Sequence, residues 1–202
     1  MSYYGINLLE AAITAPVRKR YLVDIPGGDG SVDLYEGLGQ PVYETRTVTA
    51  VFQPLSDLQQ TVSKLINDLE GRTVNIVLPE DAQHYMTGYI HIAAAGRSGA
   101  MSCDKITVTA VCLPWRYSAE EVVHQIQESE TAVQYTWNNT GGRDAVPTVK
   151  VFGEVLIEIG ASSIALSAGT YQMTTLTIPG NGSISVSISG GPAEVRYREA
   201  IL

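Results

Sequence analysis

Short segments in which polar and apolar residues alternate run along most of this 202-residue chain, and they constrain its fold more than any other feature. A period of two places successive side chains on opposite faces of a β-strand, and Val, Thr and Ile favour that conformation. The pattern predicts strands at residues 20–25, 31–34, 40–45, 46–52, 72–78, 85–93 and 105–112. In segment 46–52, Val48, Ala50 and Phe52 are expected on one face.

One segment has the period of an amphipathic helix instead. Its apolar residues form one stripe, consisting of Leu58, Val62, Leu65, Ile66 and Leu69. Ser56 is a favourable N-cap with Gln59 three residues on, which is the pattern of a capping box. Gly71 stands where a glycine commonly ends a helix. These signals predict a helix over residues 56–70.

The last third of the chain carries shorter and more closely spaced strand patterns. They lie at residues 148–152, 155–159, 163–166, 170–176 and 183–189, with a strong turn signal at residues 178–182. Short strands at regular intervals are typical of a β-sandwich. Upstream of them, residues 118–121 fit the start of a short helix, whereas residues 122–137 fit an extended chain equally well.

The fold class expected is therefore mainly β. An N-terminal domain, residues 1–125, is expected to form a β-sandwich or barrel-like structure with the one helix. A C-terminal domain, residues 126–202, is expected to form a second β-sandwich, from which the last residues can return to the first domain. The boundary is placed between Tyr117 and Tyr135.

Composition and charge exclude several classes of function. The formal net charge is −8 and the pI is about 4.8, whereas nucleic-acid binders usually present a basic field to phosphates. The one basic run, Arg-Lys-Arg at residues 18–20, is interpreted as a solvated strand edge. No apolar run reaches the roughly 18 residues that indicate a membrane span. Residues 1–5 show no basic start of a secretory signal. We expect neither nucleic-acid binding nor membrane insertion.

The glycine-rich stretch at residues 27–30 is interpreted as a β-hairpin turn. A phosphate loop needs a helix after its glycines, and here a strand pattern follows. Asp24, Asp29 and Asp33 do not have the spacing of an EF-hand calcium loop. Asp29 and Asp33 are instead expected to hold the turn by local hydrogen bonds.

The remaining polar residues do not combine into a catalytic or metal-binding pattern. His84 and His91 are an odd number of residues apart and so point to opposite faces of one strand, and His124 is distant from both. The adjacent carboxylates at residues 80–81 and 120–121 diverge in a strand. No Gly-x-Ser-x-Gly motif is present. We predict no catalytic, cofactor-binding or metal site, and no enzyme.

The two cysteines, Cys103 and Cys112, are expected on a single strand. Nine residues of extended chain separate them by roughly 30 Å, whereas a disulfide needs Cα atoms within about 7 Å. Free thiols fit synthesis in a reducing cytoplasm.

Four aromatic residues gather near the domain boundary, namely Trp115, Tyr117, Tyr135 and Trp137. Such residues serve either as core and interface anchors or as stacking surfaces for sugars. Packing is the favoured interpretation. The second one gives the alternative function, a carbohydrate-binding module that adheres to host-surface glycans.

Five motifs, in order along nearly the whole chain, resemble those of the distal tail proteins of long-tailed phages that infect Gram-positive bacteria. Residues 21–33 resemble the family's Ile-Pro-Gly-x-Asp-Gly hairpin, and residues 43–46 its following Tyr-x-x-Arg. Residues 69–72 are similar to a Leu-x-Gly-Lys/Arg before a strand, and residues 113–117 to a closing Asp-Pro-aromatic-x-Tyr. Residues 195–202 are similar to a Tyr-Arg-Glu-Gly-x-Leu ending.

Two positions depart from this pattern. Leu113 stands where an acidic residue is common, and Ala200 where glycine is common. Neither position is catalytic in the family, so the departures concern turn geometry.

The resemblance implies a structural role at a phage or prophage tail tip. It implies an N-terminal domain that forms a homo-hexameric ring and a C-terminal galectin-like β-sandwich. The ring would act as a hub between the tail tube protein and a tail-associated lysin, fibre or receptor-binding protein. It would be assembled in the cytoplasm of the bacterial host and would carry no cofactor.

Overall fold

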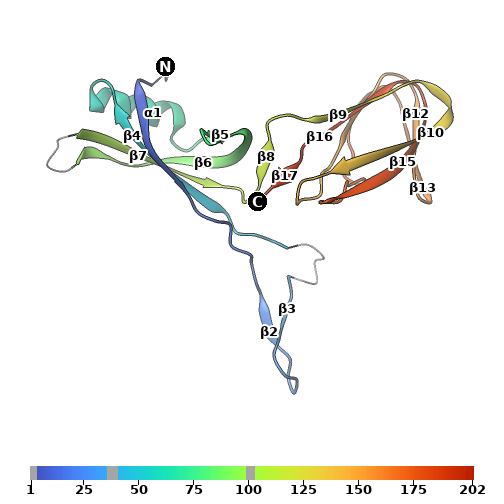
Figure 1. The fold of residues 1–202 in the computed structure, drawn as a ribbon, viewed down its shortest axis with the longest axis horizontal. Helices are drawn as coiled ribbons and strands as arrows, with labels where there is room; N and C mark the ends of the chain where they lie inside the picture. The colour runs from blue at the N-terminus through green and yellow to red at the C-terminus, as the bar shows by residue number, and fades with distance from the viewer. Residues whose placement is uncertain (1–3, 36–40, 99–102) are drawn as a thin grey trace. The chain divides into compact units, whose positions relative to one another are not determined.

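The computed structural model describes residues 4–35, 41–98 and 103–202. The chain divides into two compact units (Figure 1). Unit 1 comprises residues 1–80 and 86–114, and unit 2 comprises residues 81–85 and 115–202. The predicted boundary between residues 125 and 126 stays a prediction about folding domains.

Unit 1 is built on an antiparallel sheet. Its strands are β1 (Ile6–Ile13), β4 (Arg46–Pro54), β5 (Thr73–Leu78), β6 (Asp81–Ser98) and β7 (Cys103–Cys112), with the short pair β2 (Leu22–Asp24) and β3 (Ser31–Asp33). The sheet order is β1-β4-β7-β6, and β5 pairs with β6. Most of the predicted strands are confirmed. The strand predicted at residues 40–45 begins outside the described residues, and residues 41–45 make one isolated bridge, between Arg18 and Tyr43.

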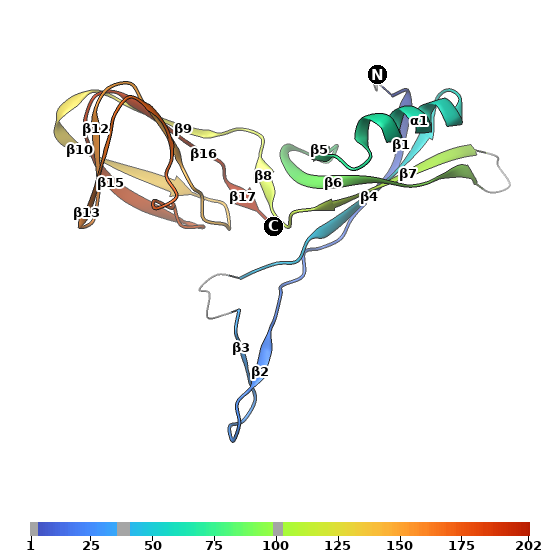
Figure 2. The same cartoon turned by 180° about the vertical axis from the view of Figure 1, so that it is seen from behind.

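The helix α1 (Leu58–Leu69) covers one face of this sheet, as both views show (Figures 1 and 2). Leu65 is buried against Ile6 of β1 and Ile106 of β7, and Phe52 packs on the same cluster. Val48 is buried in a neighbouring cluster with Met86 and other residues. The face assigned to Val48 and Phe52 is therefore confirmed.

The ends of α1 correct one prediction and confirm another. Asp57, not Ser56, is the N-cap, and its carboxylate accepts a hydrogen bond from the Gln60 N–H at 2.9 Å. The helix starts later than predicted because a carboxylate satisfies a free N–H and also interacts favourably with the helix dipole. Gly71 follows the helix with a φ of 74°, as expected. Ile66, placed in the buried stripe, is 44% exposed.

Replacing Asp57 with alanine is expected to destabilise the protein by about 1 kcal/mol, because one N–H of the first turn loses its acceptor. Urea unfolding followed by circular dichroism measures this loss. Ser56→Ala is the matched control, since the Ser56 hydroxyl lies 3.3 Å from the Thr61 hydroxyl and caps no N–H. A larger loss in the control than in Asp57→Ala would contradict the assignment.

Unit 2 contains a β-sandwich of two four-stranded antiparallel sheets. One has the order β10-β15-β12-β13 and the other β14-β11-β16-β9. Their strands are β9 (Val122–Ile126), β10 (Ser129–Asn139), β11 (Thr148–Val151), β12 (Val155–Ile159), β13 (Ser162–Leu166), β14 (Gly169–Gln172), β15 (Gly182–Gly190) and β16 (Ala193–Tyr197). Their inward side chains form one core around Trp137, Ile157 and Val195.

Two short strands, β8 (Arg116–Ser118) and β17 (Ala200–Ile201), pair with each other in unit 2. His84 and Tyr85 of β6 also pair with β8. The sequence allows either a helix or a strand after residue 118. The structure shows an extended chain, since residues 122–137 form β9 and most of β10. The predicted fold class is confirmed: mainly β, with one helix in the described residues and a C-terminal sandwich.

Candidate assembly surface

A two-stranded arm (residues 15–35 and 41–45) leaves unit 1 between β1 and β4. Its two segments continue the β1–β4 pairing. For example, the Lys19 N–H donates a hydrogen bond to the Val42 carbonyl at 2.8 Å. The arm ends in the hairpin of β2 and β3, which runs away from the sheet of the same unit (Figures 1 and 2). The basic run at residues 18–20 lies near its base.

The tip of the arm is the glycine-rich turn predicted from the sequence. The Gly28 N–H donates to the Ile25 carbonyl at 3.0 Å. Gly27 and Gly30 have φ values of 78° and 81°, which residues with a Cβ rarely adopt. The hairpin interpretation is therefore confirmed, and no helix follows these glycines.

Two aspartates of the arm form hydrogen bonds within it. The Asp33 carboxylate accepts a hydrogen bond from the Tyr21 N–H at 3.0 Å. The Asp24 carboxylate accepts one from the Ser31 hydroxyl at 2.7 Å. Asp33 acts as predicted, while the second bond comes from Asp24 and not from Asp29. These carboxylates hold the hairpin together.

One face of the arm is apolar. Val23 lies opposite Val32 in the β2–β3 register. Because side chains alternate between the two faces along each segment, three further apolar side chains lie on the same face. The full set is Tyr21, Val23, Ile25, Val32 and Leu34, with exposed fractions of 59, 40, 49, 46 and 52%. The opposite face is mostly polar and carries Asp24, Ser31 and Asp33, beside Leu22.

This apolar face has no core of its own. An isolated two-stranded hairpin is at best marginally stable in water, and a contiguous exposed apolar patch indicates an interaction surface. The apolar face of the arm is therefore a candidate interaction surface.

The three histidines have separate surroundings. The His84 ring lies 2.6 Å from Asp81, and the His91 ring lies 2.8 Å from Glu70. His124 stacks on aromatic rings of the sandwich, and burial lowers its pKa. The residues that the structure describes contain no group of three or more His, Cys, Asp or Glu side chains placed to hold a metal ion.

Two of the four carboxylates singled out in the sequence, Asp81 and Glu121, make ion pairs within unit 2. Asp81 lies 2.7 Å from Arg116, and its hydrogen bond with His84, reinforced by Arg116, lowers the pKa of Asp81. Glu121 pairs with Arg198 at 3.2 Å. The first contact links β6 to β8, and the second links the segments that precede β9 and follow β16.

Cys103 and Cys112 both lie on β7, as predicted. Cys112 is buried and free, and burial raises the pKa of its thiol; the side chain of Cys103 lies outside the described residues. Within the described chain, no helix has the length and apolar character to cross a membrane.

The aromatic residues pack inside unit 2. Trp137 is fully buried in the sandwich core, and Tyr135 packs against it. The Tyr117 ring stacks on Tyr85 with centroids 5.9 Å apart. Packing is thus confirmed for these residues. Trp137 therefore offers no face to a sugar, while Trp115, Tyr117 and Tyr135 are partly buried.

The described residues thus form a helix-covered sheet that carries an apolar arm, together with a separate β-sandwich. No family model matches the chain, and no curated protein matches it. Among solved structures it is similar to the crystal structure of the Dit protein (gp 19.1) of SPP1, a protein described as a paradigm of the hub adsorption apparatus in phages infecting Gram-positive bacteria.

This similarity extends over nearly the whole length of both chains. It covers 98% of this chain and 94% of the SPP1 protein, with a TM-score of 0.66 and 14% sequence identity. The chain therefore has the fold of a phage distal tail protein. The resemblance of the five sequence motifs and the similarity of the folds agree.

Proposed function

We propose that this chain is the hub of a phage tail tip. Six copies close into a ring, which joins the tail tube to a tail-associated lysin, fibre or receptor-binding protein. The ring is assembled in the cytoplasm of the bacterial host and resides in the virion. The fold shared with SPP1 Dit supports this proposal.

The apolar face of the arm is the observation that carries the proposal. Burying one large aliphatic side chain stabilises a complex by about 1.5–3 kcal/mol. The five apolar side chains of this face are each about half exposed, so covering them represents on the order of 4–7 kcal/mol before the entropy of association is subtracted. This gain is comparable to the cost of association, about 4–15 kcal/mol, so the arm supplies a substantial part of the contact energy between copies.

We assign the receiving surface to the N-terminal region, residues 1–125, of the next copy. Its sheet ends in β1, an edge strand on which Leu8, Leu9 and Ile13 are 41, 48 and 39% exposed. An exposed apolar edge strand needs a cover. An arm that leaves one copy and lands on a different surface of the next makes a heterologous contact, the kind that closes into rings.

Light scattering on the full chain over a wide concentration range tests the proposal. The expected species has six times the mass of the 21.7 kDa chain and appears as a ring in negative-stain images. A protein that stays monomeric at every concentration would rule out self-assembly into a hub.

A further inference from the structure

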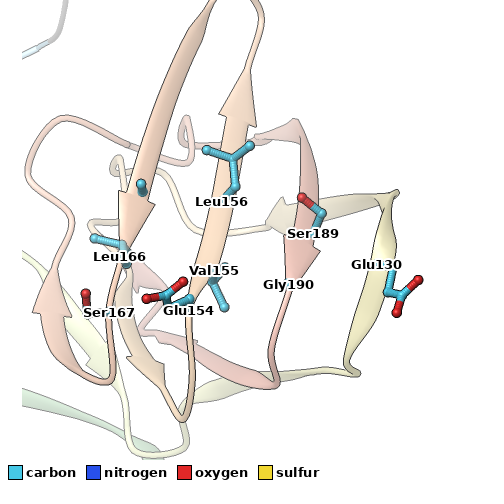
Figure 3. Close-up of a pocket in the computed structure, with 9 residues that line it drawn as sticks. Glu130, Glu154, Val155, Leu156, Leu166, Ser167, Ser189 and Gly190 are labelled. Atoms are coloured by element: carbon cyan, nitrogen blue, oxygen red, sulfur yellow. The ribbon is translucent and has the colours of Figure 1, made fainter.

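A second surface lies on unit 2, at one end of the sheet β10-β15-β12-β13. It is an open pocket of about 450 Å³ (Figure 3). The lining side chains on which its chemistry depends are Glu130, Glu154, Leu156, Leu166, Ser167 and Ser189. They come from different strands or the segments beside them, and β10 loses its regular register with β15 just at Glu130, between Ser129 and Val133.

The pocket combines negative charge with an apolar wall. Glu130 and Glu154 are both exposed, and among the described residues neither forms an ion pair. No lysine, arginine or histidine lines the pocket. Leu156, which is 37% exposed, provides aliphatic surface beside Glu154 (Figure 3). This combination matches a long cationic side chain, whose stem is apolar and whose end carries several donors.

The strand β13 beside this pocket is an open edge. It pairs only with β12 and contains no charged residue and no proline, the devices that usually protect an edge. Gly160 and Ala161 form the two-residue turn between Ile159 and Ser162, which makes that pair a hydrogen-bonded one.

Every second residue of β13 after Ser162 therefore turns its backbone outward. These residues are Ser163 and Ala165, each opposite a non-hydrogen-bonded partner in β12. Their N–H and C=O groups point away from β12 and are available to a further strand. Glu154 directly precedes the β12 residue Val155, which is paired with Leu166, so the carboxylate lies at the end of this free edge.

We propose that unit 2 binds an extended segment of a partner protein that adds a strand to β13 and places an arginine or lysine in the pocket. Backbone hydrogen bonds to Ser163 and Ala165 supply the affinity common to strand addition. Glu154, at the end of the β13 edge, selects the basic side chain by charge. This surface lies apart from the arm in the chain, and the inference does not depend on ring formation.

A pair of matched peptides tests this inference. The probes are Thr-Val-Arg-Val-Thr and Thr-Val-Glu-Val-Thr, both blocked at their ends, added to the isotopically labelled full chain and followed by amide NMR shifts. The arginine peptide is expected to perturb β13 and the pocket residues. Replacing both Glu130 and Glu154 with glutamine is expected to weaken its binding about tenfold, the effect of losing one charge-assisted contact.

Two further variants separate backbone pairing from charge. Ala165→Pro removes an outward N–H, leaves the β12 pairing in place, and is expected to abolish peptide binding. Glu158→Gln changes an exposed carboxylate on the same strand β12 outside the pocket and is expected to have no effect. Equal binding of the two peptides, shifts away from β13, or no binding at all would each overturn the inference.

Discussion

Replacing Val23 and Val32 of the arm with serine is expected to convert the proposed ring into monomers while leaving each monomer folded. The two side chains face each other across β2 and β3 and lie in the middle of the apolar face. Each loses about 1.5 kcal/mol of burial at the contact. Together they raise the concentration at which half of the protein is assembled by roughly 100-fold.

The monomer tolerates this change because neither valine belongs to a core. Both are more than one-third exposed in the single chain, so their replacement removes no packing there. Light scattering measures assembly, and circular dichroism with thermal unfolding measures the fold. A loss of assembly together with a loss of folding would point to a different role for the arm.

Leu22→Ser is the matched control for this experiment. Leu22 lies on the same strand, is 58% exposed, and points to the opposite, mostly polar face. Its replacement removes more apolar surface than Val23→Ser but is expected to shift assembly by less than about threefold, the limit for a residue outside the contact. Equal effects of the Leu22 and Val23 replacements would contradict a one-faced contact.

The sequence predicts the regular strands of this fold better than its interrupted ones. Strand β12 was expected at residues 155–159 and lies at Val155–Ile159, because its alternation is unbroken. Strand β1 was not predicted. A bulge between Leu8 and Glu10 shifts its register, so consecutive apolar residues replace the alternation.

Only part of the candidate assembly surface can be predicted from the sequence. Alternation at residues 20–25 predicts a strand with an apolar face, and the glycines after it predict the turn. A period of two does not tell whether that face is covered by the same chain or by another. The pocket of unit 2 was not predicted at all, since Glu130, Glu154 and Ser189 meet only through pairing of strands distant in sequence.

The stability of unit 2 gives the second large prediction, which concerns Gly190 at the end of β15. Its φ is 107°, a conformation that residues with a side chain rarely adopt. A Cβ placed there would lie 2.2 Å from the Glu154 carbonyl oxygen, a backbone atom that also accepts a hydrogen bond from the Gly191 N–H at 2.7 Å. The clash cannot be relieved by rotating a side chain.

Gly190→Ala is therefore expected to destabilise unit 2 by about 3–5 kcal/mol, the sum of backbone strain and overpacking. The transition of unit 2 should fall by roughly 15 °C or more. Both tryptophans of the chain, Trp115 and Trp137, belong to unit 2, so tryptophan fluorescence follows this unit alone. The far-ultraviolet signal of α1 follows unit 1 and is expected to change much less.

Gly153→Ala is the control, because Gly153 lies across the same contact from Gly191. A Cβ at Gly153 would have its nearest neighbour at 3.6 Å, an ordinary van der Waals distance, and its φ is not positive. We expect a change of less than about 1 kcal/mol there, as for a surface glycine in an unstrained conformation. Equal losses of stability in the two variants would contradict this prediction. Tight packing between the end of β15 and the start of β12 would then not stabilise unit 2, and the pocket residues on these strands would not be held in place by it.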